Sequence, residues 1–163
     1  MTEPKKEPAM DVAIRYLEHR ARTEKQVVTR LQEAGYTQDE INDCLTRLKD
    51  LHYVDDTEYA LSYLRRNLEK RRGRLRFFRE LKERGIERDI AQQAIYLFED
   101  EENLDLAELE KENAFLEAER YLDDPAPTEK ERARAGRRLA SLGYDTSLIY
   151  HILGRFERRD LDA

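Results

Sequence analysis

Apolar and polar positions follow one pattern that occurs three times along the chain. The segments that begin at Arg30, Glu80 and Arg138 align without a gap: RLQEAGYTQDEINDCLTRL, ELKERGIERDIAQQAIYLF and RLASLGYDTSLIYHILGRF. In each segment a leucine precedes a glycine by four residues, and an apolar residue follows the glycine directly. Such self-similarity predicts a repeat architecture, in which neighbouring units bury one another's apolar faces.

The spacing inside each copy predicts helices. Upstream of the segments stand AIRYL, ALSYL and AERYL, whose shared Ala-x-x-Tyr-Leu places three groups on one helical stripe. Each unit then contains this helix, a second helix that ends at the glycine, and a third helix after it. We expect Gly35, Gly85 and Gly143 to take the left-handed position beyond a helix end, with the next apolar residue packing back on the last turn.

Capping motifs support the predicted helix starts. A Thr or Asp precedes a Gln or Glu by three residues at Thr23–Gln26, Thr37–Glu40, Asp55–Glu58 and Thr128–Glu131. Prolines 125 and 127 should interrupt the chain before the last two helices. We therefore predict an all-α fold, an elongated array of three tandem three-helix repeats. Its predicted segments are a disordered tail (1–9), the three repeats (10–53, 54–100 and 101–157) and a C-terminal tail (158–163).

Composition agrees with this architecture. The chain is 39% apolar and 40% charged, which suits the thin core of an elongated array. No apolar run approaches the ~20 residues that span a bilayer, and the first ten residues lack the apolar centre of a signal peptide. Cys44 is the only cysteine, and its apolar neighbours at helical spacing predict a core position. We expect a cytoplasmic protein without a disulfide or a membrane contact.

The sequence lacks the common catalytic motifs. The sequence has no phosphate-binding Gly-x-x-x-x-Gly-Lys-Ser/Thr loop and no Gly-x-Ser-x-Gly motif, and its three histidines are scattered. The adjacent Asp55 and Asp56 could suggest acid–base or metal chemistry, but they precede a helix, where a carboxylate caps free N–H groups. We therefore predict no enzyme activity, no cofactor and no metal.

Charge is distributed very unevenly. The chain carries a net charge of -6, yet the basic block between Arg65 and Arg84 has ten Lys or Arg against three Glu, a local charge of +7. Phe77 and Phe78 align with apolar positions of the other copies, so we expect them in the core. The block would then be a helix with an apolar inside and a cationic outside. It could bind phosphates or an acidic protein surface, or be a solvated face with a few Glu–Arg pairs.

An acidic run follows the basic block. From Glu99 to Asp124 there are twelve acidic residues against two basic ones, and positive charge returns between Lys130 and Arg138. The acidic run is either a solvated helix face or a contact for a basic partner. Alternating patches of this kind favour a partner of mixed charge, such as a protein filament that carries DNA. Bare DNA is a less suitable partner because the acidic run would repel it.

Two short segments resemble the RecX family, which regulates the RecA recombinase. HYVDDTEYA, from His52 to Ala60, is similar to the family's Tyr-x-Asp-Asp-x-x-Phe/Tyr-Ala signature, and ELKERGI, from Glu80 to Ile86, resembles its Glu-Leu-x-x-x-Gly-Ile. The resemblance extends over residues 13–156. It implies a protein that binds RecA filaments on single-stranded DNA, in the filament groove; because the sequence has no obvious symmetric apolar seam, we expect a monomer. Such a protein would restrain ATP hydrolysis, strand exchange and coprotease activity, and so limit the SOS response.

The resemblance and the charge pattern together select candidate contacts to RecA or DNA. These are Arg71, Arg72, Arg74 and Arg76, then Arg65, Arg66, Lys70 and Arg79, and finally Arg134, Arg137 and Arg138. The expected partner is the RecA filament, with single-stranded DNA contacted indirectly or weakly. An Arg71→Glu, Arg72→Glu double variant should lose inhibition and keep its helicity. Tyr53, Asp55 and Asp56 are interpreted as structural residues between the first two units.

Two alternatives remain open at this point. A free-standing single-stranded nucleic-acid-binding helical protein would bind DNA without RecA, with steep salt dependence. A scaffold that docks through the acidic run would instead lose its partner when residues 99–117 are removed.

Overall fold

The computed structural model describes residues 6–122 and 127–159, which contain nine helices and no strand. The helices are α1 (Ala9–Glu18), α2 (Glu24–Glu33), α3 (Gln38–Asp50), α4 (Asp56–Glu69), α5 (Arg74–Glu83), α6 (Arg88–Glu102), α7 (Leu106–Glu119), α8 (Glu129–Leu142) and α9 (Thr146–Arg159). The predicted all-α class is confirmed. Most of both predicted tails, and Pro125 of the predicted proline break, lie outside the described residues. The predicted limits of the repeats stay a prediction.

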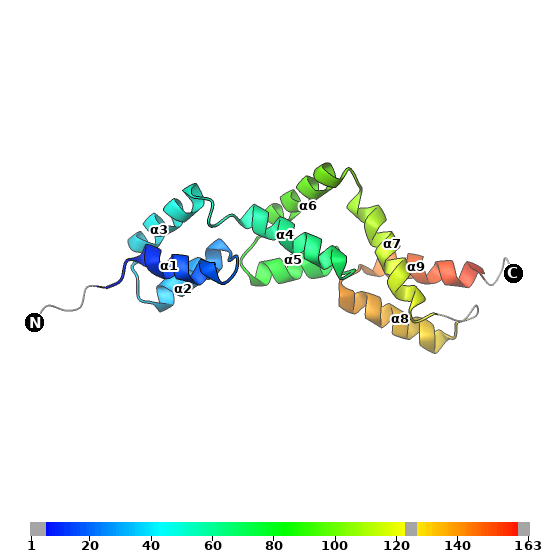
Figure 1. Cartoon of the computed structure of the whole chain (residues 1–163). Helices are drawn as coiled ribbons and strands as arrows, with labels where there is room; N and C mark the ends of the chain where they lie inside the picture. The colour runs from blue at the N-terminus through cyan, green and yellow to red at the C-terminus, as the bar shows by residue number, and fades with distance from the viewer. Residues whose placement is uncertain (1–5, 123–126, 160–163) are drawn as a thin grey trace, which may run out of the picture.

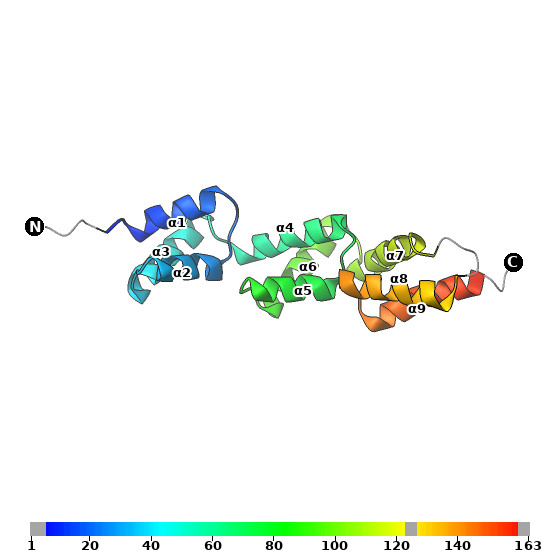
Figure 2. The same ribbon diagram turned by 90° about the horizontal axis from the view of Figure 1, so that it is seen from below.

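The helices form three units that follow one another along an elongated molecule (Figure 1). The first unit contains α1–α3, the second α4–α6 and the third α7–α9, and each has its own cluster of buried apolar side chains. In Figure 2 the second helices of the units, α2, α5 and α8, lie in one row, and α1, α4 and α7 lie in another. This arrangement confirms the elongated array of three-helix repeats.

The predicted caps and glycine ends are present. Thr23, Thr37 and Thr128 each form a complete capping box, and Asp55 accepts the N–H of Glu58. Gly35, Gly85 and Gly143 have φ angles of 85°, 86° and 98°. The residue after each glycine donates its N–H to a carbonyl five residues earlier, at Leu31, Leu81 and Leu139, with distances of 3.1, 2.9 and 3.2 Å. This is the Schellman arrangement, which satisfies a carbonyl left free at the helix end.

The two phenylalanines of the basic block and the single cysteine lie in or against the apolar cores of their units. Phe77 is fully buried in the core of the second unit, and Phe78 packs against that core beneath the guanidinium of Arg88. Cys44 is buried beside the sulfur of Met10, 3.8 Å away, and burial raises the pKa of its thiol. The predicted core positions of Phe77 and Cys44 are confirmed, and Phe78 lies partly buried at the edge of the core.

Neighbouring units are joined through the ends of their second helices. At the first junction, the hydroxyl of Thr23 at the start of α2 donates to the carbonyl of Arg84 at the end of α5, over 2.6 Å. At the second junction, the N–H of Gly73 before α5 donates to the carbonyl of Leu142 at the end of α8, over 2.8 Å. Groups that a helix end leaves unpaired therefore satisfy one another, and the helix dipoles run head to tail.

The adjacent carboxylates at the first junction have separate structural roles. Asp55 caps α4, whereas the buried Asp56 accepts the N–H of Glu24 in the first turn of α2, over 3.0 Å. The prediction that these residues fix how the second unit leaves the first agrees with the contact of Asp56, whereas the hydrogen bond that Asp55 accepts comes from α4 itself. Tyr53, which the same prediction included, has an exposed side chain.

The requirement for glycine at position 73 comes from close packing between units. Gly73 has a φ of -88°, which any residue can adopt, so the turn alone does not need a glycine. A Cβ at this position would lie 2.4 Å from the carbonyl oxygen of Gly143. The glycine lets the start of α5 approach the end of α8.

A Gly73→Ala variant should therefore weaken the second junction. The new methyl group would force the backbones apart, and overpacking of this kind costs about 1–3 kcal/mol. Urea unfolding followed by circular dichroism would measure the loss. Gly154→Ala is the matched control, because nothing lies within 4 Å of a Cβ there and alanine is the better helix former. Equal stability of Gly73→Ala and the wild-type protein would contradict the close-packing explanation.

Candidate cationic interface at the junction of the second and third units

The predicted cations lie on α4, α5, α8 and the link between α4 and α5. Because α5 starts where α8 ends, patches that are far apart in sequence meet at the second junction. Burial and the positive charges of Arg72, Arg79 and Arg138 lower the pKa of Arg76. An arginine stays protonated at neutral pH even so, because its unperturbed pKa is very high. Arg138 of the third unit thus joins the cations of the second unit in one cluster.

Two of the predicted contact residues are engaged inside the protein. The Nε of Arg74 lies 2.8 Å from Oε1 of Glu110, and Nη1 of Arg71 lies 3.9 Å from Oε1 of Glu117. Both glutamates belong to α7 and are only 5% exposed. Burial raises the pKa of Glu110, and the nearby Arg74 acts in the opposite direction. These ion pairs attach the basic block to the third unit.

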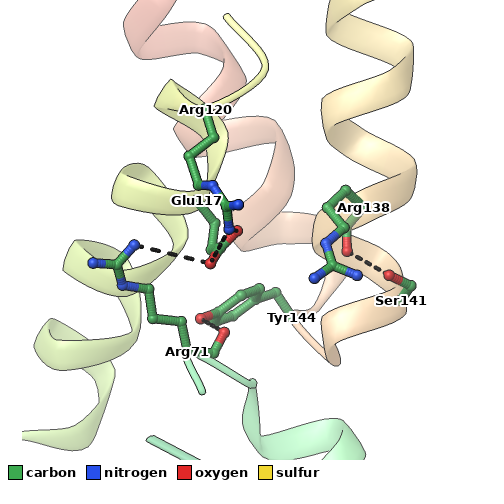
Figure 3. A network of polar contacts seen from close by, with 6 residues as sticks. All are labelled: Arg71, Glu117, Arg120, Arg138, Ser141 and Tyr144. Carbon is green, nitrogen blue, oxygen red and sulfur yellow. Dashed lines mark hydrogen bonds and ion pairs between the residues drawn. The ribbon is translucent and has the colours of Figure 1, made fainter. Parts of the chain in front are cut away.

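Tyr144 adds a neutral contact to the same junction (Figure 3). Its hydroxyl donates to the backbone carbonyl of Arg71, over 2.5 Å. Burial and the negative charges of Glu110 and Glu117 raise the pKa of Tyr144, so the hydroxyl keeps its proton. Arg71 itself has a φ of 53°, the left-handed position at the end of α4. Both the backbone and the side chain of Arg71 therefore hold the junction together.

The acidic run compensates part of the basic block, a role that neither sequence alternative included. Besides Glu110 and Glu117, Glu101 of α6 lies 2.5 Å from the guanidinium of Arg65. Glu99 accepts the N–H of Leu106 at the start of α7. Removing residues 99–117 would eliminate these contacts together with most of α7, so that deletion would test folding and not docking. Asp123 and Asp124 lie outside the described residues.

The remaining predicted cations are better placed to meet a partner. Arg66 lies over the ring of Tyr63 and Arg134 over that of Tyr121, each 5.6 Å from the ring centroid, and Arg76 pairs with Glu80 over 2.5 Å. Five of the predicted contact residues have neither an ion-pair partner nor an aromatic ring beneath them in the described part of the chain: Lys70, Arg72, Arg79, Arg137 and Arg138. These five are the strongest candidates for an outward contact.

One further cation was missed in the sequence. Arg84, directly after the last residue of α5, also lies over the ring of Tyr63, 4.8 Å from the ring centroid. Its guanidinium donates to the carbonyl of Glu80. Its position eight residues after Arg76, with Glu80 halfway between, places all three on one helical stripe. That spacing could have included Arg84 among the candidates.

Other kinds of site are not seen among the described residues. The described side chains contain no group of three or more His, Cys, Asp or Glu that could hold a metal ion. His19, His52 and His151 are exposed. In the parts of the chain that the structure covers, no helix is both long enough and apolar enough to cross a membrane.

These observations define an elongated helical repeat protein with a cationic junction between its second and third units. Family models for the first and second three-helix domains of RecX match residues 9–48 and 55–95. A regulatory protein RecX of Chromohalobacter salexigens is 30% identical over 143 residues, which cover 88% of this chain and 89% of that protein. The chain therefore belongs to the RecX family of regulatory proteins.

Other relatives agree with this assignment. A regulatory protein RecX of Clostridium botulinum (strain Eklund 17B) is 28% identical over 147 residues, 88% of this chain. The chain spans 66% of that relative, just under two thirds of its length. The crystal structure of RecX from Lactobacillus salivarius shares the fold, with a TM-score of 0.77, 24% identity and coverage of 91% of this chain and 94% of that one.

Proposed function

We propose that this protein binds RecA filaments on single-stranded DNA and mainly inhibits their ATP hydrolysis, strand exchange and coprotease activity. It would thereby limit recombination and the SOS response. The observation that carries the proposal is the cluster of unpaired arginines at the second junction, in a chain of the RecX family. The protein acts by binding, as a monomer in the cytoplasm, and catalyses no reaction of its own.

The elongated shape supports a filament as the partner. Units joined end to end give a long surface, and repeat arrays commonly use such surfaces to bind extended partners. Arg79 and Arg138 stand on two successive units of this surface and lie close to Arg76. Their planar guanidinium groups suit carboxylates on a protein as well as phosphates on DNA.

A second candidate is a free-standing protein that binds single-stranded nucleic acid. The proximity of Arg72, Arg79 and Arg138 to Arg76 favours it, because such a cluster attracts phosphates without any other partner. It differs from the first candidate in needing no RecA.

The decisive experiment is a titration of RecA-catalysed ATP hydrolysis on single-stranded DNA, with RecA from the same bacterium. We expect the rate to fall when this protein is present at well below one molecule per RecA, because a bound molecule affects neighbouring subunits of the filament. A parallel titration without RecA measures binding to the DNA alone. An unchanged hydrolysis rate together with tight binding to bare DNA would replace the proposal with the second candidate.

A further inference from the structure

A groove runs between α4 and α5 on the second unit. Its main cavity has a volume of about 470 Å³ and is lined by five cations: Arg66, Lys70, Arg72, Arg76 and Arg84. Two acidic residues, Glu80 and Glu83, also line it. An adjoining cavity of about 400 Å³ shares Tyr63, Arg66, Glu83 and Arg84 and extends to Arg20, between α1 and α2. The two cavities form one groove with an excess of positive charge.

Helical spacing explains why these side chains face one another. Tyr63 and Arg66 on α4, and Lys70 directly after its last residue, follow at intervals of three and four. On α5, Arg76 and Glu80 follow at an interval of four and continue the stripe toward Arg84. The two stripes make the two walls of the groove.

A buried amide in the groove has an unused donor. Asn67 lines the main cavity, its side chain is only 2% exposed, and its Nδ2 has no hydrogen-bond partner among the described residues. A buried donor without a partner costs about 1–3 kcal/mol. An oxygen atom of a bound anion would supply the missing acceptor.

One carboxylate already occupies part of the groove. Glu80 accepts the Tyr63 hydroxyl and pairs with Arg76, so it neutralises one of the five lining cations. Burial raises the pKa of Glu80 and nearby Glu83 raises it further, while Arg84 lowers it. Lys70 and Arg72 have no such partner in the described part of the chain. The groove therefore keeps cations that an external anion can reach.

The acidic run does not line this groove. None of its described residues borders either cavity, and Glu101 meets Arg65, which lies next to the stripe on α4 and does not border the groove. Glu110 and Glu117 are held at the junction by Arg74 and Arg71. The repulsion of DNA that the sequence suggested is therefore reduced at the groove itself.

We propose that this groove binds the phosphate backbone of a single-stranded nucleic acid. Two cavities in succession suit a linear polyanion, and arginine guanidiniums suit phosphate oxygens. Arg66 and Arg84 both lie on Tyr63, so the ring is engaged by cations and is not a free platform for bases. Contacts to the backbone alone would be independent of sequence. The inference deepens the proposed function and rests on it, because the DNA inside a RecA filament would be the natural ligand.

Binding of a labelled twelve-residue oligothymidylate, followed by fluorescence anisotropy without RecA, tests the groove. A Lys70→Ala, Arg72→Ala variant should bind about tenfold more weakly than the wild-type protein. Its salt dependence should be shallower by about 0.7 per lost contact in the slope of log affinity against log salt concentration. The matched control, Arg47→Ala with Lys130→Ala, loses the same charge outside the groove and should bind normally. Equal loss in both variants would overturn the proposal.

A Glu80→Gln variant should bind oligothymidylate more tightly than the wild-type protein, a result that a misfolded variant would not give. Removing the internal carboxylate should free Arg76 and tighten oligothymidylate binding severalfold. Inorganic phosphate, titrated by NMR, should shift the side-chain amide signal of Asn67, and oligothymidylate should shift it at far lower concentrations. A shift with phosphate but none with the oligonucleotide would overturn the nucleic-acid assignment, as would equal competition by a polyglutamate peptide.

The outcome is separable from that of the proposed function. Binding of the oligonucleotide in the groove without any effect on RecA would refute the proposed function and uphold the groove. Inhibition of RecA by a wild-type protein that binds no oligothymidylate would do the reverse.

Discussion

Reversing the charge of Arg79 and Arg138 together should raise the concentration needed for half-inhibition of RecA ATP hydrolysis about tenfold. Both side chains lie close to Arg76, neither has an ion-pair partner among the described residues, and neither borders the groove. At roughly 0.7 kcal/mol for each exposed charge contact, two lost contacts give about 1.4 kcal/mol, a factor of ten. The measurement is a titration of the Arg79→Glu, Arg138→Glu variant against RecA on single-stranded DNA.

The matched control reverses two exposed arginines of the first unit, Arg30 and Arg47. This variant carries the same net charge as the test variant, so it separates a local contact from a general electrostatic effect. Circular dichroism should show the same helicity for both variants. Identical inhibition curves for the two variants would show that the arginines at the second junction do not form the RecA contact.

Arg71 is a poor choice for the same test. Reversal of Arg71 would place a carboxylate opposite the buried Glu117 and would also affect the residue that accepts the Tyr144 hydroxyl. A loss of inhibition in an Arg71→Glu, Arg72→Glu variant would therefore mix a lost contact with a weakened junction. The weakened junction would also lower the stability of this double variant, an effect that the sequence alone did not indicate.

Local features of the fold could be predicted because short segments determine them. The capping box at Thr23 involves residues three apart, and the glycine at position 85 ends α5 through a hydrogen bond within five residues. Because the unit occurs three times, the sequence contains several copies of these local signals. The same pattern, with the quoted family signatures, was enough to predict the helices, their grouping and the family.

The junction could not be predicted because its partners are distant in sequence. Arg74 and Glu110 are 36 residues apart, and Arg71 and Tyr144 are 73 apart. Charge counting treats all arginines of the basic block alike, whereas the structure divides them between internal pairs and outward cations. Likewise, only the packing of α5 on α8 reveals why position 73 needs a glycine.

This division gives the acidic run a physical explanation. Two adjacent units can place arginines at their junction only if buried carboxylates neutralise those that point inward. Glu110 and Glu117 do so from α7, and the outward arginines then remain available on the surface. The basic surface and the acidic helix α7 are thus two parts of one structural arrangement.

Replacing Arg74 with Met should destabilise the protein by about 3 kcal/mol at pH 7. The change keeps most of the apolar stem but leaves the carboxylate of Glu110 buried without its cation. Breaking a buried pair in this way costs about 3–5 kcal/mol, and the lower end applies because Arg74 itself is 32% exposed. Urea unfolding gives the free energy. Arg65→Met is the matched control, because its pair with Glu101 is exposed on both sides and should contribute less than about 1 kcal/mol.

The pH dependence of the Arg74→Met variant separates loss of charge pairing from loss of packing. Burial raises the pKa of Glu110 and Arg74 opposes that rise, so the variant should have a still higher pKa at this carboxyl. A carboxyl whose pKa is higher in the folded state destabilises the fold as the pH rises through that pKa, and protonation removes the penalty. The deficit relative to the wild-type protein should therefore shrink as the pH falls below the pKa of Glu110. A deficit of the same size at pH 7 and in mild acid would mean that the packing of the Arg74 stem, and not its charge, holds the junction.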